Sequence, residues 1–235
     1  MPPGRGWRPS SAGAEVAELI VIRHGQASFG AAEAGGYDRL TPLGVEQSRM
    51  AGEALRAAGL TPDRLITGTL ERQKDTLAQM GFDGTPEEHA GFNEYDFHDM
   101  LRARFGGPLP DQVVKDRKHH FRTLRDTLID WQQDRLPGAA ESWTAFRDRV
   151  EAARRHAIRP GARCVLAISS GGTIGRLVAQ TLQTPDEGMI TLNLQIKNTS
   201  VTRFIFNDKG RFFLHEFNAT PHFTSADAAR HMSYS

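Results

Sequence analysis

The feature that most restricts the fold of this chain is a short apolar run with a charged, glycine-containing end. Leu19-Ile20-Val21-Ile22 is followed directly by Arg23-His24-Gly25. A run this short and this rich in β-branched residues is typical of a buried strand. The residues after such a strand lie at the edge of the sheet, where open α/β folds bind ligands. Arg beside His suits an anion, because a guanidinium holds it and a neutral imidazole can attack it.

Strand and helix patterns alternate along most of the chain. Thr41-Pro42 predicts the start of a helix that ends before Gly59, since threonine caps helices and proline suits their first position. Strands are predicted at 64–67 and 164–168, each followed by a helix, and a strand pair at 201–206 and 212–217. This alternation favours an α/β fold with a mostly parallel sheet sandwiched between helices.

The middle of the chain is predicted to add a helical cap to that domain. Residues 81–110 are rich in glycine and proline, which predicts mostly loop, and apolar residues recur at helical spacing over 111–135 and 141–158. We therefore expect one α/β domain over 18–224, with a helical insertion at about 97–140. The flanking segments 1–17 and 225–235 are expected to be disordered tails.

Composition argues against several classes of function. The formal net charge is +1, which gives no support for nucleic-acid binding through bulk charge. No stretch approaches the roughly 20 apolar residues of a membrane span, and the first residues lack the apolar centre of a secretory signal. The single cysteine, Cys164, cannot form an intramolecular disulfide. We expect a cytoplasmic protein that binds neither nucleic acid nor membrane.

Further motifs follow the first one in a fixed order. A second arginine, Arg72, comes just after the strand at 64–67, within Thr67-Gly68-Thr69-Leu70-Glu71-Arg72. A loop carries Asn93-Glu94-Tyr95, and Ser169-Ser170-Gly171-Gly172 connects a strand to a helix. Together these motifs resemble those of the histidine phosphatase superfamily, which includes the cofactor-dependent phosphoglycerate mutases. The resemblance covers most of residues 18–217.

The resemblance implies phosphoryl transfer without metal or other cofactor. By this resemblance His24 accepts the phosphoryl group as a phosphohistidine, and Glu94 protonates the leaving alkoxide and then activates a water. The physical chemistry agrees, since a phosphate monoester is an anion that the forked guanidiniums of Arg23 and Arg72 can grip. Gln26 and Ser28 are candidate additional donors, and the backbone at Gly171 would face an anion at a helix start.

The chain departs from the superfamily pattern at one position. Ser170 stands where the resemblance implies a second histidine. A serine donates a hydrogen bond but brings no charge, so this departure threatens rate more than binding. Either the serine suffices, or a histidine from elsewhere enters the site, for which His222 and, less strongly, His98 are candidates. A third alternative is a weak or inactive relative.

Three functions remain open at this stage. The first is a phosphoric monoester hydrolase acting on a small-molecule substrate. The second is a phosphoglycerate mutase, which is disfavoured because the segment after Glu94 lacks the arginine-rich substrate loop associated with mutases. The third is a module that recognises phosphate without turning it over. The strands at 201–206 and 212–217 are predicted at the sheet edge, where they could pair in a homodimer.

Overall fold

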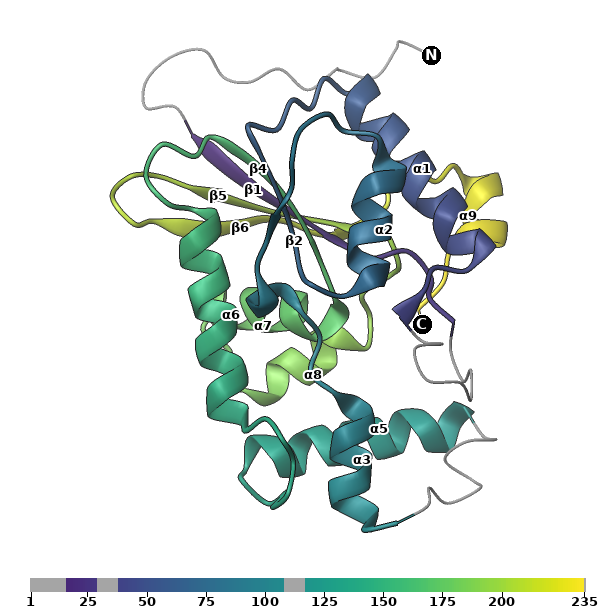
Figure 1. Ribbon diagram of the computed structural model, residues 1–235, viewed down its shortest axis with the longest axis vertical. Helices are drawn as coiled ribbons and strands as arrows, with labels where there is room; N and C mark the ends of the chain where they lie inside the picture. The colour runs from purple at the N-terminus through teal and green to yellow at the C-terminus, as the bar shows by residue number, and fades with distance from the viewer. Residues whose placement is uncertain (1–15, 29–37, 108–116, 235) are drawn as a thin grey trace.

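A six-stranded sheet forms the centre of the computed structural model, which describes residues 16–28, 38–107 and 117–234 (Figure 1). Its strand order is β3-β2-β4-β1-β5-β6. Strands β1 to β4 are mutually parallel, and β5 and β6 form an antiparallel pair with β5 also antiparallel to β1. The strands are β1 (Ala17–Arg23), β2 (Arg64–Thr67), β3 (Glu87–Glu88), β4 (Cys164–Ser169), β5 (Val201–Phe206) and β6 (Phe212–Ala219). The predicted mostly parallel α/β sheet is confirmed.

Helices cover both faces of the sheet, which gives three layers. Helices α1 (Pro42–Ala57) and α2 (Glu71–Met80) lie on one face. The other face is covered by α6 (Trp143–Ala157), α7 (Gly171–Thr181) and α8 (Glu187–Asn193). The apolar run in β1 serves both layers, because successive side chains of a strand point to opposite faces.

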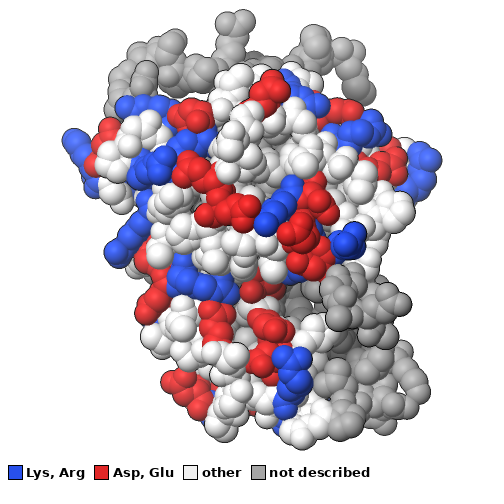
Figure 2. All heavy atoms as spheres, viewed as in Figure 1, with Lys and Arg blue, Asp and Glu red and all other residues white. Residues whose placement is uncertain are grey.

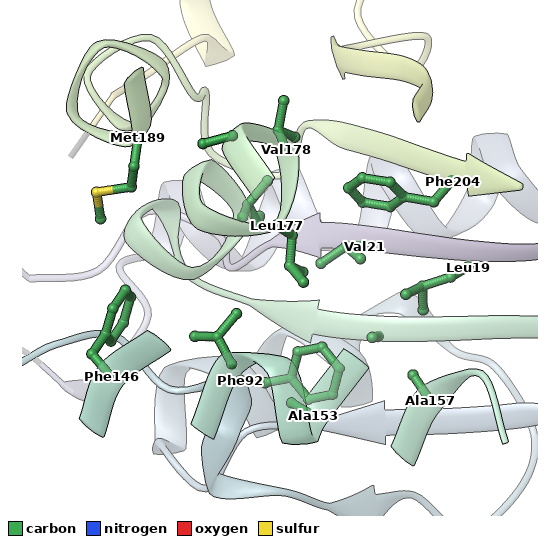
Figure 3. Close-up of a cluster of buried hydrophobic side chains, with 14 of the residues drawn as sticks. Leu19, Val21, Phe92, Phe146, Ala153, Ala157, Leu177, Val178, Met189 and Phe204 are labelled. Carbon is green, nitrogen blue, oxygen red and sulfur yellow. The ribbon is translucent and has the colours of Figure 1, made fainter. Parts of the chain in front are cut away.

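The two apolar clusters show this division directly. Leu19 and Val21 belong to the cluster under α6 and α7, which Figure 3 shows with Phe146, Leu177 and Phe204. The residues between them, Ile20 and Ile22, belong to the cluster under α1 and α2. All four side chains are fully buried. A polar residue within this run would therefore be buried in one core or the other, which explains why the run is uniformly apolar.

Most of the predicted elements are confirmed. Helix α1 begins at Pro42, and the Thr41 side chain caps it by accepting a hydrogen bond from the backbone of Gly44. The pairing of β1 with β4 then identifies the edge of the sheet at which the candidate site residues lie. Arg23 at the end of β1 lies opposite Ser169 at the end of β4. The residues that follow these two strands are thereby brought together.

Two segments contain helices that the sequence did not predict individually. Helix α3 (Phe97–Phe105) lies in the segment expected to be mostly loop and within the helical insertion expected at about 97–140, and Asp96 caps it by accepting from the backbone of Asp99. The 225–235 segment is not simply a tail, because Ser225–His231 forms helix α9 with a capping box between Thr224 and Asp227. Both starts rest on short polar caps that the Gly, Pro and Ser content obscured. Of the predicted tail over 1–17, residues 1–15 lie outside the described residues, and Ala17 begins β1.

The cap region consists of α3 and α5 (Arg117–Gln132), which pack against one another beyond the ends of the strands (Figure 1). Residues 111–116 of the predicted long helix lie outside the described residues. On the face shown in Figure 2, acidic and basic side chains are interspersed rather than sorted by sign. Within the described ranges, no helix combines the length and the apolar character needed to cross a membrane.

Candidate active site

The loop after β1 is held in place by backbone hydrogen bonds. The His24 backbone N–H donates to the carbonyl of Ser169 at 2.9 Å, and its own carbonyl accepts from Asn198 Nδ2 at 3.1 Å. The next residue, Gly25, donates its N–H to Thr76 Oγ1 at 3.0 Å. The neighbouring strand β4, helix α2 and the segment before β5 therefore fix the position of His24. A nucleophile held this firmly is already oriented for attack.

Glycine at position 25 is required by close packing. A Cβ atom there would lie 2.5 Å from the carbonyl oxygen of Gly44 and 2.7 Å from Ser48 Oγ, both on α1. Its backbone does not have a positive φ, so packing and not backbone conformation requires the glycine. The first turn of α1 instead packs directly on the loop that carries His24.

The contacts of the His24 ring fix its tautomer. Nδ1 lies 2.7 Å from the carbonyl oxygen of Gly25, which can only accept, so Nδ1 carries the proton. The Nε2 lone pair then accepts from Arg72 Nε at 3.2 Å. Burial, followed by the charges of Arg72 and Arg23, holds the pKa of His24 well below its usual value. The imidazole is therefore neutral at neutral pH, with Nε2 as its basic nitrogen.

Arg72 is held by a residue that the sequence analysis missed. Its Nη1 forms an ion pair with Asp38 Oδ1 at 2.9 Å. The same carboxylate accepts from the backbone N–H of Glu71 at 3.0 Å, at the start of α2. Leu70, the residue before this helix, has no side chain that could cap it. Asp38 thus caps α2 and pins Arg72, and no local pattern could reveal this because the contact is between distant segments.

Arg23 completes the cationic side of the site. Its side chain is 7% exposed, and its Nη1 donates to the carbonyl of Ile196. The charges of Arg23 and Arg72 both act on the pKa of His24 and on that of Glu94. The structure therefore places His24 and Glu94 within reach of the same two arginine charges.

The carboxyl group of Glu94, which belongs to the loop before α3, lies against the start of helix α7. Its Oε2 accepts from the backbone N–H of Gly172 at 3.0 Å. A Cβ at Gly172 would lie 2.2 Å from Glu94 Oε1, so the glycine makes room for the carboxyl group. Burial raises the pKa of Glu94, against the opposing effects of the Gly172 N–H and the two arginines. From the sequence, the backbone N–H groups of this helix start are expected to face a ligand, whereas the Glu94 carboxyl group accepts from one of them.

A second missed residue, Arg149 on α6, supports the Glu94 loop. Its Nη1 donates to the carbonyl of Asn93 at 2.8 Å and its Nη2 to that of Glu94 at 3.2 Å. The same guanidinium pairs with Glu141 through two further bonds. A cavity of about 220 Å³ opens beside this loop, and neither His24 nor Arg72 lines it. Its lining residues are Ala90, Asn93, Glu94, Asp96, Asp99, Met100, Ala140, Glu141 and Arg149.

Ser170 and Gly171 lie where β4 passes into α7, between Arg23 and α2. A Cβ at Gly171 would lie 3.6 Å from Arg23 Cζ, which places this backbone against the cationic side. Ser170 is fully buried, and its Oγ lies 2.9 Å from Nε2 of Gln73, the residue after Arg72. Ser170 thus lies beside the residue that follows Arg72 in the chain, and its role toward phosphate stays a prediction.

The remaining candidates contact other parts of the molecule. Gln26 Oε1 accepts from the hydroxyl of Thr41, and Ser28 donates its backbone N–H to Arg39. His98 is exposed on α3. These contacts place none of the three side chains against His24.

His222 is held by Thr199, outside the cationic cluster that Arg23, His24 and Arg72 form. It is 8% exposed, and its Nε2 lies 3.0 Å from Thr199 Oγ1. Its ring packs beside Phe223, with the ring centroids 4.1 Å apart. Thr199 in turn donates its backbone N–H to the carbonyl of Arg23 at 3.1 Å, so one residue separates His222 from the Arg23 backbone. These contacts give no support to His222 as a substitute for the second histidine.

Comparison with known proteins agrees with this arrangement. Residues 19–220 match the histidine phosphatase superfamily, branch 1. The chain belongs to the histidine phosphatase superfamily. The match spans the sheet and both helical layers. It includes Arg23, His24 and Arg72.

Curated relatives of this superfamily member include proteins described as 2,3-bisphosphoglycerate-dependent phosphoglycerate mutase. One from Bradyrhizobium diazoefficiens is 36% identical over 131 residues, which are 47% of this chain and 62% of that protein. One from Parvibaculum lavamentivorans is 28% identical over 75% of this chain and 85% of that protein. The chain thus spans about three fifths of the length of the first relative.

Solved structures with the same fold include phosphatases. A mycobacterial glucosyl-3-phosphoglycerate phosphatase aligns with a TM-score of 0.63 and 24% identity, over 87% of this chain and 100% of that one. The alpha-ribazole phosphatase from Shigella flexneri aligns with a TM-score of 0.62 and 23% identity, over 86% and 96%. At these identities the likeness shows that this superfamily member shares their fold.

Proposed function

We propose that this protein is a phosphoric monoester hydrolase that acts through a phosphohistidine on His24. The observation that carries the proposal is the contact of His24 Nε2 with Arg72, together with two arginines whose charges act on both His24 and the Glu94 carboxyl group. His24 has a lowered pKa and is a neutral nucleophile, and Glu94 has a raised pKa and favours the protonated acid. Sites whose titratable groups are pushed apart in this way have divided the roles of nucleophile and acid between them.

The first half of the reaction transfers the phosphoryl group to the enzyme. His24 Nε2 attacks phosphorus, the ester P–O bond breaks, and the leaving oxygen takes the proton of the Glu94 carboxyl group. In the second half a water attacks phosphorus and gives a proton to the Glu94 carboxylate. The P–N bond then breaks, which releases inorganic phosphate and neutral His24 with Glu94 protonated again. Both halves use the same two side chains, so no further group is required for proton balance.

Arg23 and Arg72 are the residues that would hold the phosphoryl oxygens. Both side chains are buried, at 7% and 5% exposure, where a charge acts more strongly than in water. In phosphoryl transfer the charge spreads over the equatorial oxygens, and fixed cations stabilise it. The substrate class that fits these residues is a small-molecule phosphomonoester. Its alcohol portion is not specified by the described contacts.

Phosphoglycerate mutase is the second candidate, because curated relatives carry that name. The two functions share the phosphohistidine and differ in the acceptor of the second step. Water accepts the phosphoryl group in a hydrolase, whereas a second alcohol oxygen accepts it in a mutase. The proposal of hydrolysis therefore stands or falls on the fate of the phosphoenzyme.

The test compares wild type with His24→Ala on an aryl phosphate and on 3-phosphoglycerate. We expect His24→Ala to lower aryl phosphate hydrolysis by at least about 10³-fold and to abolish an acid-labile, base-stable phosphoenzyme. His215→Ala, on an exposed position of β6, is the control and should match wild type. Conversion of 3-phosphoglycerate to the 2-isomer faster than its hydrolysis would establish the mutase instead. Phosphate binding without turnover would establish a recognition module.

A further inference from the structure

The Ser170 side chain does not form the hydrogen bond that a serine at a helix start usually forms. It occupies the N-cap position of α7, where a serine oxygen ordinarily accepts from a backbone N–H of the first turn. The Ser170 hydroxyl makes no such bond. It lies instead 2.9 Å from Gln73 Nε2 on helix α2. The side chain is therefore held by another helix rather than by its own.

The direction of this hydrogen bond can be deduced. Gln73 Nε2 also lies 2.9 Å from the backbone carbonyl of Phe92, which can only accept. The amide must therefore turn its nitrogen toward both Phe92 and Ser170, and Ser170 Oγ accepts from it. Its own proton has no acceptor among the described residues. Because Ser170 is fully buried, a proton without an acceptor is costly unless a ligand supplies one.

We propose that Gln73 is a positioning residue that aims the Ser170 hydroxyl proton at a phosphoryl oxygen. The inference deepens the hydrolase proposal and rests on it for the identity of the ligand. Three chain neighbours of the pair contact residues of the candidate active site. Arg72, next to Gln73 in the chain, contacts His24; Gly171, next to Ser170, lies against Arg23; and Gly172 binds Glu94. The pair supplies one neutral donor where the resemblance implied an imidazole.

The two side chains also share one limited space. Gln73 is fully buried, and its Oε1 packs directly against Gly68, where an added Cβ would lie only 1.9 Å from that oxygen. An imidazole at position 170 would extend several atoms beyond Ser170 Oγ, into the volume that the Gln73 amide fills. Gln73 and Ser170 therefore act as a matched pair, in which neither can be enlarged alone.

The first test removes the amide and the hydroxyl separately and together. Gln73→Met keeps the volume without the hydrogen bond, and Ser170→Ala removes the donor. We expect each to lower kcat and the affinity for vanadate by about 10- to 100-fold, with KM changed less than about threefold. The double variant should be no worse than Ser170→Ala, because Gln73 acts only through Ser170.

A matched control separates positioning from general damage. Gln180→Met makes the same chemical change on α7, where Gln180 donates to Glu151 and not to the site. It should leave vanadate affinity and kcat unchanged. Effects of Gln73→Met and Ser170→Ala that multiply in the double variant would overturn the proposal, as would a Gln73→Met variant with wild-type kcat and vanadate affinity.

A second test exploits the shared space. Ser170→His alone should lose thermal stability and vanadate affinity, whereas Ser170→His with Gln73→Ala should recover both. If Ser170→His is as stable and active alone as with Gln73→Ala, the matched-pair inference is wrong. Titration with vanadate reports on the pair whether or not the enzyme turns over. Failure of the hydrolase proposal, seen as absent His24-dependent turnover, is thus distinguishable from failure of this one.

Discussion

The two sides of the candidate phosphate site are built in different ways. On one side Arg23, His24 and Arg72 concentrate positive charge around a nucleophile, and the carbonyl of Ile196 and the carboxylate of Asp38 hold the two guanidiniums. On the other side Ser170 and Gln73 offer a single neutral donor. The cationic side is suited to capture any phosphate, because its attraction does not depend on fine geometry. On the neutral side, the Ser170 hydroxyl contributes only if its proton points at a phosphoryl oxygen.

This contrast separates binding from rate. Charge that attracts substrate and transition state equally lowers KM without raising kcat. A donor aimed at the position that an oxygen reaches during transfer raises kcat instead. We therefore expect variants on the two sides to differ in kind as well as in size.

Glu94→Gln should have the largest effect among these variants, and the effect should depend on the leaving group. A glutamine keeps an oxygen for the Gly172 N–H but cannot give a proton. For an alkyl phosphate, whose alkoxide needs that proton, we expect kcat to fall by about 10²- to 10⁴-fold. For p-nitrophenyl phosphate, whose leaving group is stable as an anion, formation of the phosphoenzyme should fall far less. Rapid quench on both substrates measures the difference.

The pH profile of the first step gives an independent check on Glu94. The carboxyl group must be protonated to act as acid, and burial raises its pKa. Phosphoryl transfer from an alkyl phosphate should therefore decline as pH rises through that raised pKa, and the decline should vanish in Glu94→Gln. An equal loss on both leaving groups with an unaltered pH profile would show that Glu94 serves structure rather than proton transfer.

Asp38→Asn should produce a smaller effect on the cationic side. The asparagine amide cannot accept from both the Arg72 side chain and the start of α2 as the carboxylate does. Without the carboxylate to hold it, the Arg72 guanidinium attracts the phosphoryl group less strongly in both substrate and transition state. We expect kcat/KM to fall by about tenfold and the free energy of unfolding by at most about 1 kcal/mol, as for the loss of a partly exposed ion pair. Steady-state kinetics and denaturant titration measure the two.

An increase in activity would contradict this account of Asp38. It would mean that the carboxylate competes with phosphate for Arg72 instead of holding it in place. Asp208→Asn provides a control, because Asp208 is an exposed acidic residue in the turn before β6 and far from the site along the sheet. It should leave both kcat/KM and stability unchanged.

The sequence predicted the cationic side well and the neutral side poorly, for a physical reason. Arg23 and His24 follow a strand whose apolar pattern fixes where it ends, so their place at the sheet edge could be deduced. Arg72 follows the next predicted strand in the same way. Ser170 was found by its position, but its partner Gln73 reads in the sequence as an ordinary polar residue of a helix. Only the packing of α2 against the end of β4 turns it into a buried donor.

The same limit explains the other omissions. Asp38 caps a helix that begins 33 residues later, and Arg149 holds a loop 56 residues earlier in the chain. Neither contact leaves a local pattern, because capping and clamping across such distances depend on the completed fold. The short helices α3 and α9 were missed for the opposite reason, since their caps are local but lie within segments whose composition indicates loop.

His222→Gln should have the smallest effect on activity and therefore tests whether the neutral side recruits a histidine. If Ser170 and Gln73 complete the site, kcat and vanadate affinity at pH 7 should remain within about twofold of wild type. A loss of tenfold or more would place the imidazole in the reaction after all. His215→Gln, at an exposed position, is the matched control.

The contribution of His222 should appear in acid stability instead. Burial lowers the pKa of His222 from 6.5 to about 4. Between these values the unfolded chain binds a proton that the folded protein does not, so stability is complete above pH 6.5 and is lost as pH falls toward 4. The loss amounts to about 3 kcal/mol at most.

Denaturant titrations at pH 7 and pH 4.5 should show a smaller acid loss in His222→Gln than in wild type. Some loss should persist, because His24 also has a lowered pKa. An identical acid loss in both proteins would show that His222 is not buried as a neutral imidazole.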